Sequence, residues 1–154
     1  MKIALGADHR GAATIKMLVD KLKREGHQVD VLADVSAPTS DYPDAAFFVG
    51  KAVGEGRDEL GILVCGTGVG VGIAANKLPG IRAAVVHDEL TAQLSRSHNN
   101  ANVLCLSGDL LGQRLIEKIV DVWLHTEFEG GRHARRIHKI GAIEKGIDPA
   151  SVKE

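Results

Sequence analysis

The stretch Ile62-Leu-Val-Cys-Gly-Thr-Gly-Val-Gly-Val-Gly-Ile-Ala-Ala-Asn-Lys77 runs from an apolar strand pattern through Cys65 into alternating glycines that open a helix. Glycines let backbone N–H groups approach a ligand without a Cβ, and the first helical turn adds unpaired donors. Cys65 ends the strand at its carboxyl end, where open α/β sheets bind ligands, and a nearby helix N-terminus favours the thiolate. We therefore predict an anion-binding loop with a base at its entrance.

This glycine loop departs from two better-known phosphate-binding patterns. It lacks the Gly-Lys-Ser/Thr that closes a P-loop, and its glycines are spaced by two, unlike those of the dinucleotide fingerprint. Asp88, about 20 residues further on, imitates the ribose-binding acid of that fingerprint, but an N-cap role is simpler. Dinucleotide binding and a turn needed only for packing stay open as alternatives to binding of a small anion.

The composition predicts a single domain, residues 1–154, with an aliphatic core. Of the 154 residues, 44% are hydrophobic and only 3% aromatic. Val, Ile, Leu and Ala must therefore fill the core, which suits a parallel sheet covered by helices. The net charge of −1 argues against binding to nucleic acid or a membrane surface.

Short β-branched runs alternate with helix-period patterns along the chain. The predicted strands are 2–6, 28–33, 61–64, 82–86 and 102–106, and the predicted helices between and after them are 11–25, 44–56, 88–97 and 110–125. Residues 34–43, with two prolines, are predicted to form a loop. Repeated βα units predict an α/β fold: a Rossmann-like three-layer αβα sandwich with a five-stranded parallel sheet and a C-terminal helical arm.

Cysteine usage and hydropathy predict a cytoplasmic protein. The two cysteines, Cys65 and Cys105, follow separate strand patterns, and the chain begins directly with a strand pattern rather than a signal peptide. We expect both thiols to be reduced and Cys105 to belong to the core. No apolar run approaches the roughly 20 residues that span a bilayer.

Two polar segments are candidates for work beside Cys65. Asp8-His9-Arg10 follows the first strand and should reach the same sheet edge as Cys65, although Asp8 could instead cap a helix. His98-Asn99 ends the helix before the last strand, where a histidine could transfer protons near neutral pH or simply face the helix dipole. The histidines show no metal-ligand spacing, so we expect no metal.

The C-terminal arm, residues 128–154, begins with a basic segment and ends in a polar tail. Arg132 and Arg136 are four residues apart and would share a helix face, where two guanidinium groups could hold one phosphate. A solvated charged helix is the alternative. Such arms often pack on a partner subunit.

Together these elements resemble the family of ribose-5-phosphate isomerase B and galactose-6-phosphate isomerase. The resemblance covers nearly the whole chain. The blocks that carry it are Gly6-Ala-Asp-His9, Asp41-Tyr-Pro43, Ile62-Leu-Val-Cys-Gly-Thr-Gly-Val-Gly70, Ile73-Ala-Ala-Asn-Lys77, Gly80-Ile-Arg-Ala83, Ala92-Gln-Leu-Ser-Arg96, Ser97-His-Asn-Asn-Ala-Asn-Val103 and Glu129-Gly-Gly-Arg-His133.

The resemblance implies an aldose–ketose isomerase of carbohydrate metabolism, with ribose 5-phosphate as substrate, a place in the pentose phosphate pathway and no cofactor. It implies Cys65 as the base that moves the proton, and His98, helped by Asp8 and Thr67, as the group that opens the sugar ring. The substrate-binding positions it implies are Asp8, His9, Gly66, Thr67, Gly68, Val69, Gly70, Asn99, Arg132 and Arg136. It also implies a homodimer or homotetramer in which His98 and the arm meet the Cys65 loop of a partner.

One position departs from the family pattern. Asp109 stands where many relatives of the ribose-5-phosphate type carry an arginine near the ligand. A carboxylate facing the substrate would repel a phosphate and accept hydrogen bonds from hydroxyl groups, whereas one facing solvent, or capping the helix from Leu110, would be neutral for function. Other aldose phosphates (allose 6-phosphate, galactose 6-phosphate or a tetrose phosphate) and a non-catalytic sugar-phosphate-binding subunit therefore stay open as alternatives.

Overall fold

A computed structural model of the chain describes residues 1–33 and 40–152. The part of the predicted loop at 34–39 lies outside the described residues. The strands are β1 (Lys2–Ala7), β2 (Gln28–Val31), β3 (Leu60–Cys65), β4 (Ala83–Val85) and β5 (Val103–Ser107). The helices are α1 (Ala12–Arg24), α2 (Tyr42–Gly54), α3 (Val69–Ala75), α4 (Glu89–Ser97), α5 (Gln113–His125), α6 (Arg132–Glu144) and the short 3-10 helix η1 (Pro149–Ser151).

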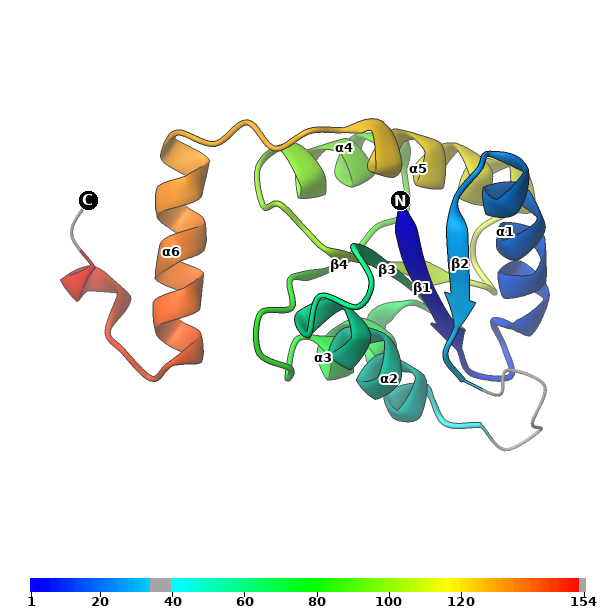
Figure 1. Cartoon of the computed structure of the whole chain (residues 1–154), viewed down its shortest axis with the longest axis horizontal. Coiled ribbons are helices and arrows are strands. Elements are labelled where there is room, and N and C mark those ends of the chain that lie inside the picture. Colours follow the sequence, from blue (N-terminus) through cyan, green and yellow to red (C-terminus); the bar gives the residue numbers. More distant parts are fainter. Residues whose placement is uncertain (34–39, 153–154) are drawn as a thin grey trace.

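The five strands form one parallel sheet in the order β2-β1-β3-β5-β4. Helices α1, α4 and α5 cover one face, and α2 and α3 cover the other (Figure 1). The predicted α/β fold with a five-stranded parallel sheet is therefore confirmed. With right-handed βα crossovers, the face that a helix covers depends on the direction in which the chain crosses the sheet. The chain crosses one way through α1 and α4 and the other way through α2 and α3, which places these pairs on opposite faces.

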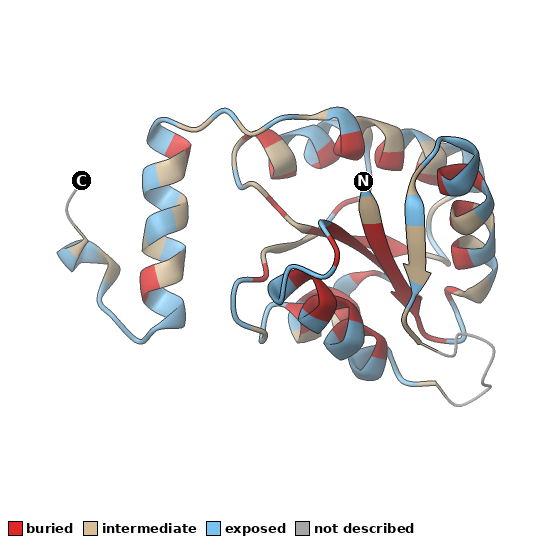
Figure 2. Cartoon of the chain, in the orientation of Figure 1, coloured by how far each residue is buried: buried red, intermediate tan, exposed pale blue. Residues whose placement is uncertain are grey.

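The core lies in two aliphatic layers on either side of the central strands. Successive residues of a strand point to opposite faces, so Ile3 and Leu5 pack under α1 and α5 while Ala4 packs under α2. Figure 2 shows this burial along β1 and β3, whereas the edge strand β2 is only partly covered. Cys105 is fully buried in β5, as predicted.

Two helix boundaries differ from the predicted ones for local reasons. Helix α2 begins at Tyr42, because Pro43 fits the first turn of a helix, where no N–H is needed. Helix α5 begins only at Gln113, because the hydroxyl of Ser107 accepts the N–H of Leu110 at 2.9 Å and holds the intervening residues in a turn. Asp109 therefore lies in this turn, away from the start of α5.

Helix α6 stands apart from the three layers, beyond the edge of the sheet that β4 forms (Figure 1). Ile140 and Ile143 on α6 and Ile147 after it are 44%, 61% and 49% exposed. Residues spaced by three or four lie on one helix face, so the arm presents an apolar stripe that its own chain leaves uncovered. No helix among residues 1–33 and 40–152 is long and apolar enough to cross a membrane.

Candidate active site

The thiol of Cys65 is held by the backbone of the glycine loop. Cys65 is the last residue of β3 and is only 4% exposed, and the N–H of Gly68 donates to its Sγ at 3.2 Å. Gly68 has φ +80°, a left-handed conformation that other residues adopt only with strain. The turn at Gly68 thus aims an amide at the sulfur, and a donated hydrogen bond stabilises negative charge there.

Close packing explains several of the other glycines. A Cβ on Gly70 would lie 2.9 Å from the ring of Tyr42, and one on Gly72 would lie 2.6 Å from Val85. A Cβ on Gly66 would lie 2.9 Å from a carboxylate oxygen of Asp109. The loop is therefore enclosed by the start of α2 and by the turn after β5. Helix α3 has only seven residues, so it offers the amides of its first turn rather than a long helix dipole.

Asp8 lies next to the loop at the same sheet edge, as predicted. Its N–H donates to the carbonyl of Val64 at 3.3 Å, and its side chain is buried and accepts the N–H of Arg10 at 2.9 Å. The N-cap of α1 is Gly11, so Asp8 shapes the turn before the helix instead of capping it. His9 is exposed, with Nδ1 3.4 Å from the carbonyl oxygen of Ser40.

Thr67 and Val69 complete this group, which we call the thiol cluster: Asp8, His9 and residues 65–70. The hydroxyl of Thr67 accepts the N–H of Val69 at 3.2 Å, so the side chain is fixed at the start of α3. Val69 is 48% exposed and lies on the open side of the loop. The cluster offers an enclosed sulfur, a hydroxyl and backbone amides within one turn of chain, with the carboxylate of Asp8 beside them.

His98 belongs to a second group, which we call the histidine cluster: His98, Asn99, Glu129, Arg132, His133 and Arg136. The rings of His98 and His133 stack in parallel with centroids 4.1 Å apart, and Glu129 lies 4.0 Å and 3.6 Å from their Nε2 atoms. Stacking ties the end of α4 to the first turn of α6, where Arg132 begins the helix. Arg136 follows one turn later on the same helix face, as predicted.

Charge in the histidine cluster is set by burial. His133 is only 5% exposed, and burial lowers its pKa, with the neighbouring His98 and Arg132 lowering it further. His133 is therefore neutral at pH 7. Asn99 is anchored through its carbonyl, which accepts the Nε–H of Arg82 at 3.2 Å.

The ligand atoms of His98, Glu129 and His133 lie within 4.8 Å of one another, a spacing that a metal ion could bridge. The spacing of residues in the sequence does not reveal this group, because it joins residues 35 positions apart. A nitrogen lone pair lies in the plane of its ring, and the two ring planes are parallel within 6°. An ion between the rings would lie out of both planes, so the stacked geometry does not suit a metal ion.

Within one chain, the thiol cluster lies at the carboxyl ends of the strands and the histidine cluster lies at their amino ends. Cys65 and Asp8 follow the carboxyl ends of β3 and β1, whereas Asn99 contacts Arg82 at the amino end of β4. A strand of six residues separates these edges by roughly 16 Å. The structure thus brings together Asp8, Cys65 and Thr67, and separately His98, Arg132 and Arg136, but does not join the two sets within a chain.

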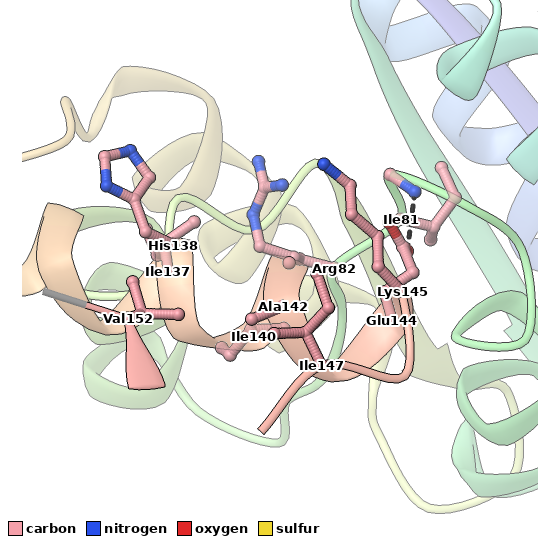
Figure 3. Close-up of a pocket in the computed structure, with 12 residues that line it drawn as sticks. Ile81, Arg82, Ile137, His138, Ile140, Ala142, Glu144, Lys145, Ile147 and Val152 are labelled. Atoms are coloured by element: carbon pink, nitrogen blue, oxygen red, sulfur yellow. Dashed lines mark hydrogen bonds between the residues drawn. The ribbon is translucent and has the colours of Figure 1, made fainter. Parts of the chain in front are cut away.

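A groove of about 460 Å³ lies between α6 and the Gly80–Arg82 segment (Figure 3). Glu144 accepts the N–H of Gly80 at 2.8 Å and fixes the arm there. The groove is lined mainly by aliphatic side chains, with Arg82, His138 and Lys145 at its rim. It contains no member of the thiol cluster, so we assign it to the seating of the arm rather than to chemistry.

A buried thiol on a glycine turn at the carboxyl edge of a doubly wound sheet defines an α/β enzyme of small anionic substrates. A sequence model described as Ribose/Galactose Isomerase matches residues 3–140. The chain belongs to the ribose/galactose isomerase family and is an isomerase.

Relatives and solved structures agree with this membership. Ribose-5-phosphate isomerase B of Escherichia coli is 46% identical over 94% of this chain and 97% of its own length. The ribose-5-phosphate isomerase B structure from Clostridium thermocellum has a TM-score of 0.92 and 48% identity, covering 95% of this chain and 99% of that one. The enzyme from Mycoplasma genitalium, solved with bound ribulose 5-phosphate, has a TM-score of 0.89 and 47% identity, covering 94% and 96%.

We expect Gly68→Ala to lower both activity and stability. The left-handed φ alone costs about 1–2 kcal/mol in a non-glycine residue, and a Cβ would also lie 3.1 Å from the carbonyl carbon of Leu106. Relief of that contact would move the Gly68 N–H away from Cys65, so kcat should fall by about tenfold or more.

Gly56→Ala is the matched control, because Gly56 has φ +71° but no atom within 4 Å of an added Cβ. Urea unfolding and steady-state kinetics should show a similar strain cost in both variants and an activity loss only at Gly68. Equal kinetics in the two variants would contradict the role of the Gly68 turn.

Proposed function

We propose that this protein interconverts ribose 5-phosphate and ribulose 5-phosphate through an enediolate. The observation that supports it most is the N–H of Gly68 donated to the sulfur of Cys65, since it places a base and backbone amides in one enclosed turn. Membership of the isomerase family supplies the reaction class. The ligand of the Mycoplasma genitalium structure supplies the substrate by analogy.

In the proposed reaction, the Cys65 thiolate takes the proton from C2 of the open-chain aldose. The electrons of the broken C–H bond form the C1–C2 double bond, and negative charge develops on the oxygen of C1. Amides of residues Gly66 to Gly70 stabilise that oxygen, and the proton of the C2 hydroxyl passes to it. The thiol then returns its proton to C1 while the C2–O bond becomes the carbonyl of the ketose. General acid–base catalysis contributes about 10²–10⁴-fold, and one oxyanion donor about 10²–10³-fold.

The other site residues act on the ring and the phosphate. His98 opens the sugar ring by proton transfer between the ring oxygen and the anomeric hydroxyl, with Asp8 and Thr67 orienting the substrate. Arg132 and Arg136 hold the phosphate with paired guanidinium donors. The remaining contacts that we propose are with His9, Asn99 and Val69, and no cofactor or metal takes part in this scheme.

The proposed active site is shared between two copies of the chain. Each chain holds its thiol cluster and its histidine cluster at opposite sheet edges, so a second copy is needed to bring His98 to Cys65. The uncovered isoleucine stripe of α6 supports such an exchange, because an apolar helix face is stabilised by burial against a partner. We therefore propose a homodimer or a pair of dimers, in which residues 1–154 form one domain whose 128–154 arm packs on a partner.

We also propose a cytoplasmic location, supported by the free thiols of Cys65 and Cys105. The alternative substrates stay within the same chemistry: allose 6-phosphate, galactose 6-phosphate or a tetrose phosphate. A relative from Pectobacterium atrosepticum is named for D-erythrulose 4-phosphate, so the family accommodates more than one sugar. A non-catalytic binding subunit is disfavoured, because a binder has no use for a sulfur held by the Gly68 amide.

We expect Cys65→Ala to abolish most ketose formation while leaving the fold intact. The thiol is small and lies at the end of a strand, so alanine fills most of its space. Ketose formation from a panel of aldose phosphates, ribose 5-phosphate first, measures the effect, with Cys105→Ala as a cysteine control outside the loop. Near-normal turnover in Cys65→Ala would contradict the role of the thiol. If the unmodified protein converts only another aldose phosphate, that sugar and not ribose 5-phosphate is its substrate.

We expect His98→Ala to slow ring opening more than proton transfer. Turnover of cyclic ribose 5-phosphate should fall by about 10²-fold or more, while an aldose phosphate that cannot cyclise, such as glyceraldehyde 3-phosphate or erythrose 4-phosphate, should lose much less. The ratio of the two kcat/KM values measures the difference. Equal losses on both kinds of substrate would contradict the ring-opening role.

A further inference from the structure

Arg10 and Asp109 form an ion pair across the top of the thiol cluster. The Nε and Nη2 of Arg10 both donate to one carboxylate oxygen of Asp109, at 3.0 Å and 2.7 Å. Arg10 follows β1, Asp109 follows β5, and β3 with Cys65 lies between those strands in the sheet. The pair therefore bridges two loops directly over the start of the glycine loop.

The backbone holds both ends of this pair in place. Asp8 accepts the N–H of Arg10, and the N–H of Asp109 donates to the carbonyl of Gly66 at 3.2 Å. A Cβ on Gly108 would lie 2.9 Å from the carbonyl oxygen of Arg10, so the two loops are in contact. Only a glycine at position 108 permits that approach, and the backbone of Arg10 is thereby held beside the thiol cluster.

The ion pair between Arg10 and Asp109 adds little to the stability of the fold. The Arg10 and Asp109 side chains are 56% and 36% exposed, and exposed ion pairs contribute little to folding. At the loop, the charges matter more. An unpaired carboxylate against Gly66 would repel an anionic substrate, whereas Asp109 bonded to Arg10 is neutralised, and Asp109 in turn raises the pKa of Arg10.

We propose that Arg10 is a phosphate-binding residue of this site and that Asp109 is its positioning residue. A guanidinium has five N–H donors and Asp109 takes two of them, so three stay available to phosphate oxygens. Arg10 thus adds a cation for the phosphate from the chain that holds Cys65. Arg132 and Arg136 add theirs from the arm. The inference rests on the proposed function for the identity of the phosphate ester.

The test compares Arg10→Ala, Arg10→Lys and Asp109→Asn with Arg57→Ala. Arg57 is the matched control, since it is an exposed arginine paired with Glu55 at 3.1 Å, and it precedes β3 at the opposite sheet edge. Loss of either arginine changes the net charge equally. The readouts are KM and kcat for ribose 5-phosphate and the Ki of inorganic phosphate, with thermal unfolding as a check on folding.

We expect Arg10→Ala to raise KM and the Ki of inorganic phosphate in parallel by about tenfold or more, with a much smaller change in kcat. Arg10→Lys should recover part of both, because it restores the charge without the forked donors. Asp109→Asn should raise both constants by a smaller factor, because the guanidinium stays but loses its anchor. Arg57→Ala should match the unmodified protein.

Two results would overturn the proposal. One is KM and Ki in Arg10→Ala within twofold of the unmodified protein, and the other is a raised KM with an unchanged Ki, which would place Arg10 away from the phosphate. If Arg10→Ala does not fold, Arg10→Gln removes the same positive charge and keeps a longer side chain. If the unmodified protein turns over no aldose phosphate, the proposed function fails, and the Kd of inorganic phosphate by calorimetry still decides the role of Arg10.

Discussion

Parallel pairing of the strands is the constraint on which the rest of this molecule depends. It sends every carboxyl end to one edge of the sheet, so the turns after β1, β3 and β5 meet and enclose the sulfur of Cys65. The same constraint sends the helix before β5 back to the other edge, and with it His98. One feature of topology thus both builds the thiol cluster and separates it from the histidine cluster.

The C-terminal arm carries part of the histidine cluster, which lies away from the thiol cluster of the same chain. Helix α6 joins the body through the stack of His133 on His98 and through the contact of Glu144 with Gly80, while its isoleucines stay exposed. A helix that binds its own chain through a few polar and ring contacts and leaves isoleucines exposed is suited to packing on a second copy. In the proposed dimer, assembly and catalysis depend on the same element.

The sequence was sufficient for the fold and for the local chemistry of the loop. Periodicity located every strand and the helices between them, because a buried parallel sheet needs continuous aliphatic runs. The glycine pattern predicted the turn at Cys65, and an N-cap role for Asp88 is confirmed by its acceptance of the Thr91 N–H at 2.7 Å. These features depend on residues close together in the chain.

Contacts between distant segments could not be predicted in the same way. The order of strands in the sheet, the Tyr42 ring on Gly70, the stack of His133 on His98 and the pairing of Arg10 with Asp109 all join residues 20 or more positions apart. Asp109 illustrates the point. From the sequence it was an unpaired charge near a ligand or a helix cap, whereas in the structure its partner is Arg10, two residues after Asp8.

The central claim is that one active site takes Cys65 from one chain and His98 from another, and subunit mixing tests it most directly. Cys65→Ala and His98→Ala chains, each nearly inactive on ribose 5-phosphate, would be unfolded together, refolded and assayed beside each variant refolded alone. In a symmetric dimer with shared sites, half of the dimers are mixed and each has one intact site, so activity should recover to about a quarter of the unmodified level. Activity no higher than the average of the two variants would contradict the shared site and place Cys65 and His98 in a single chain.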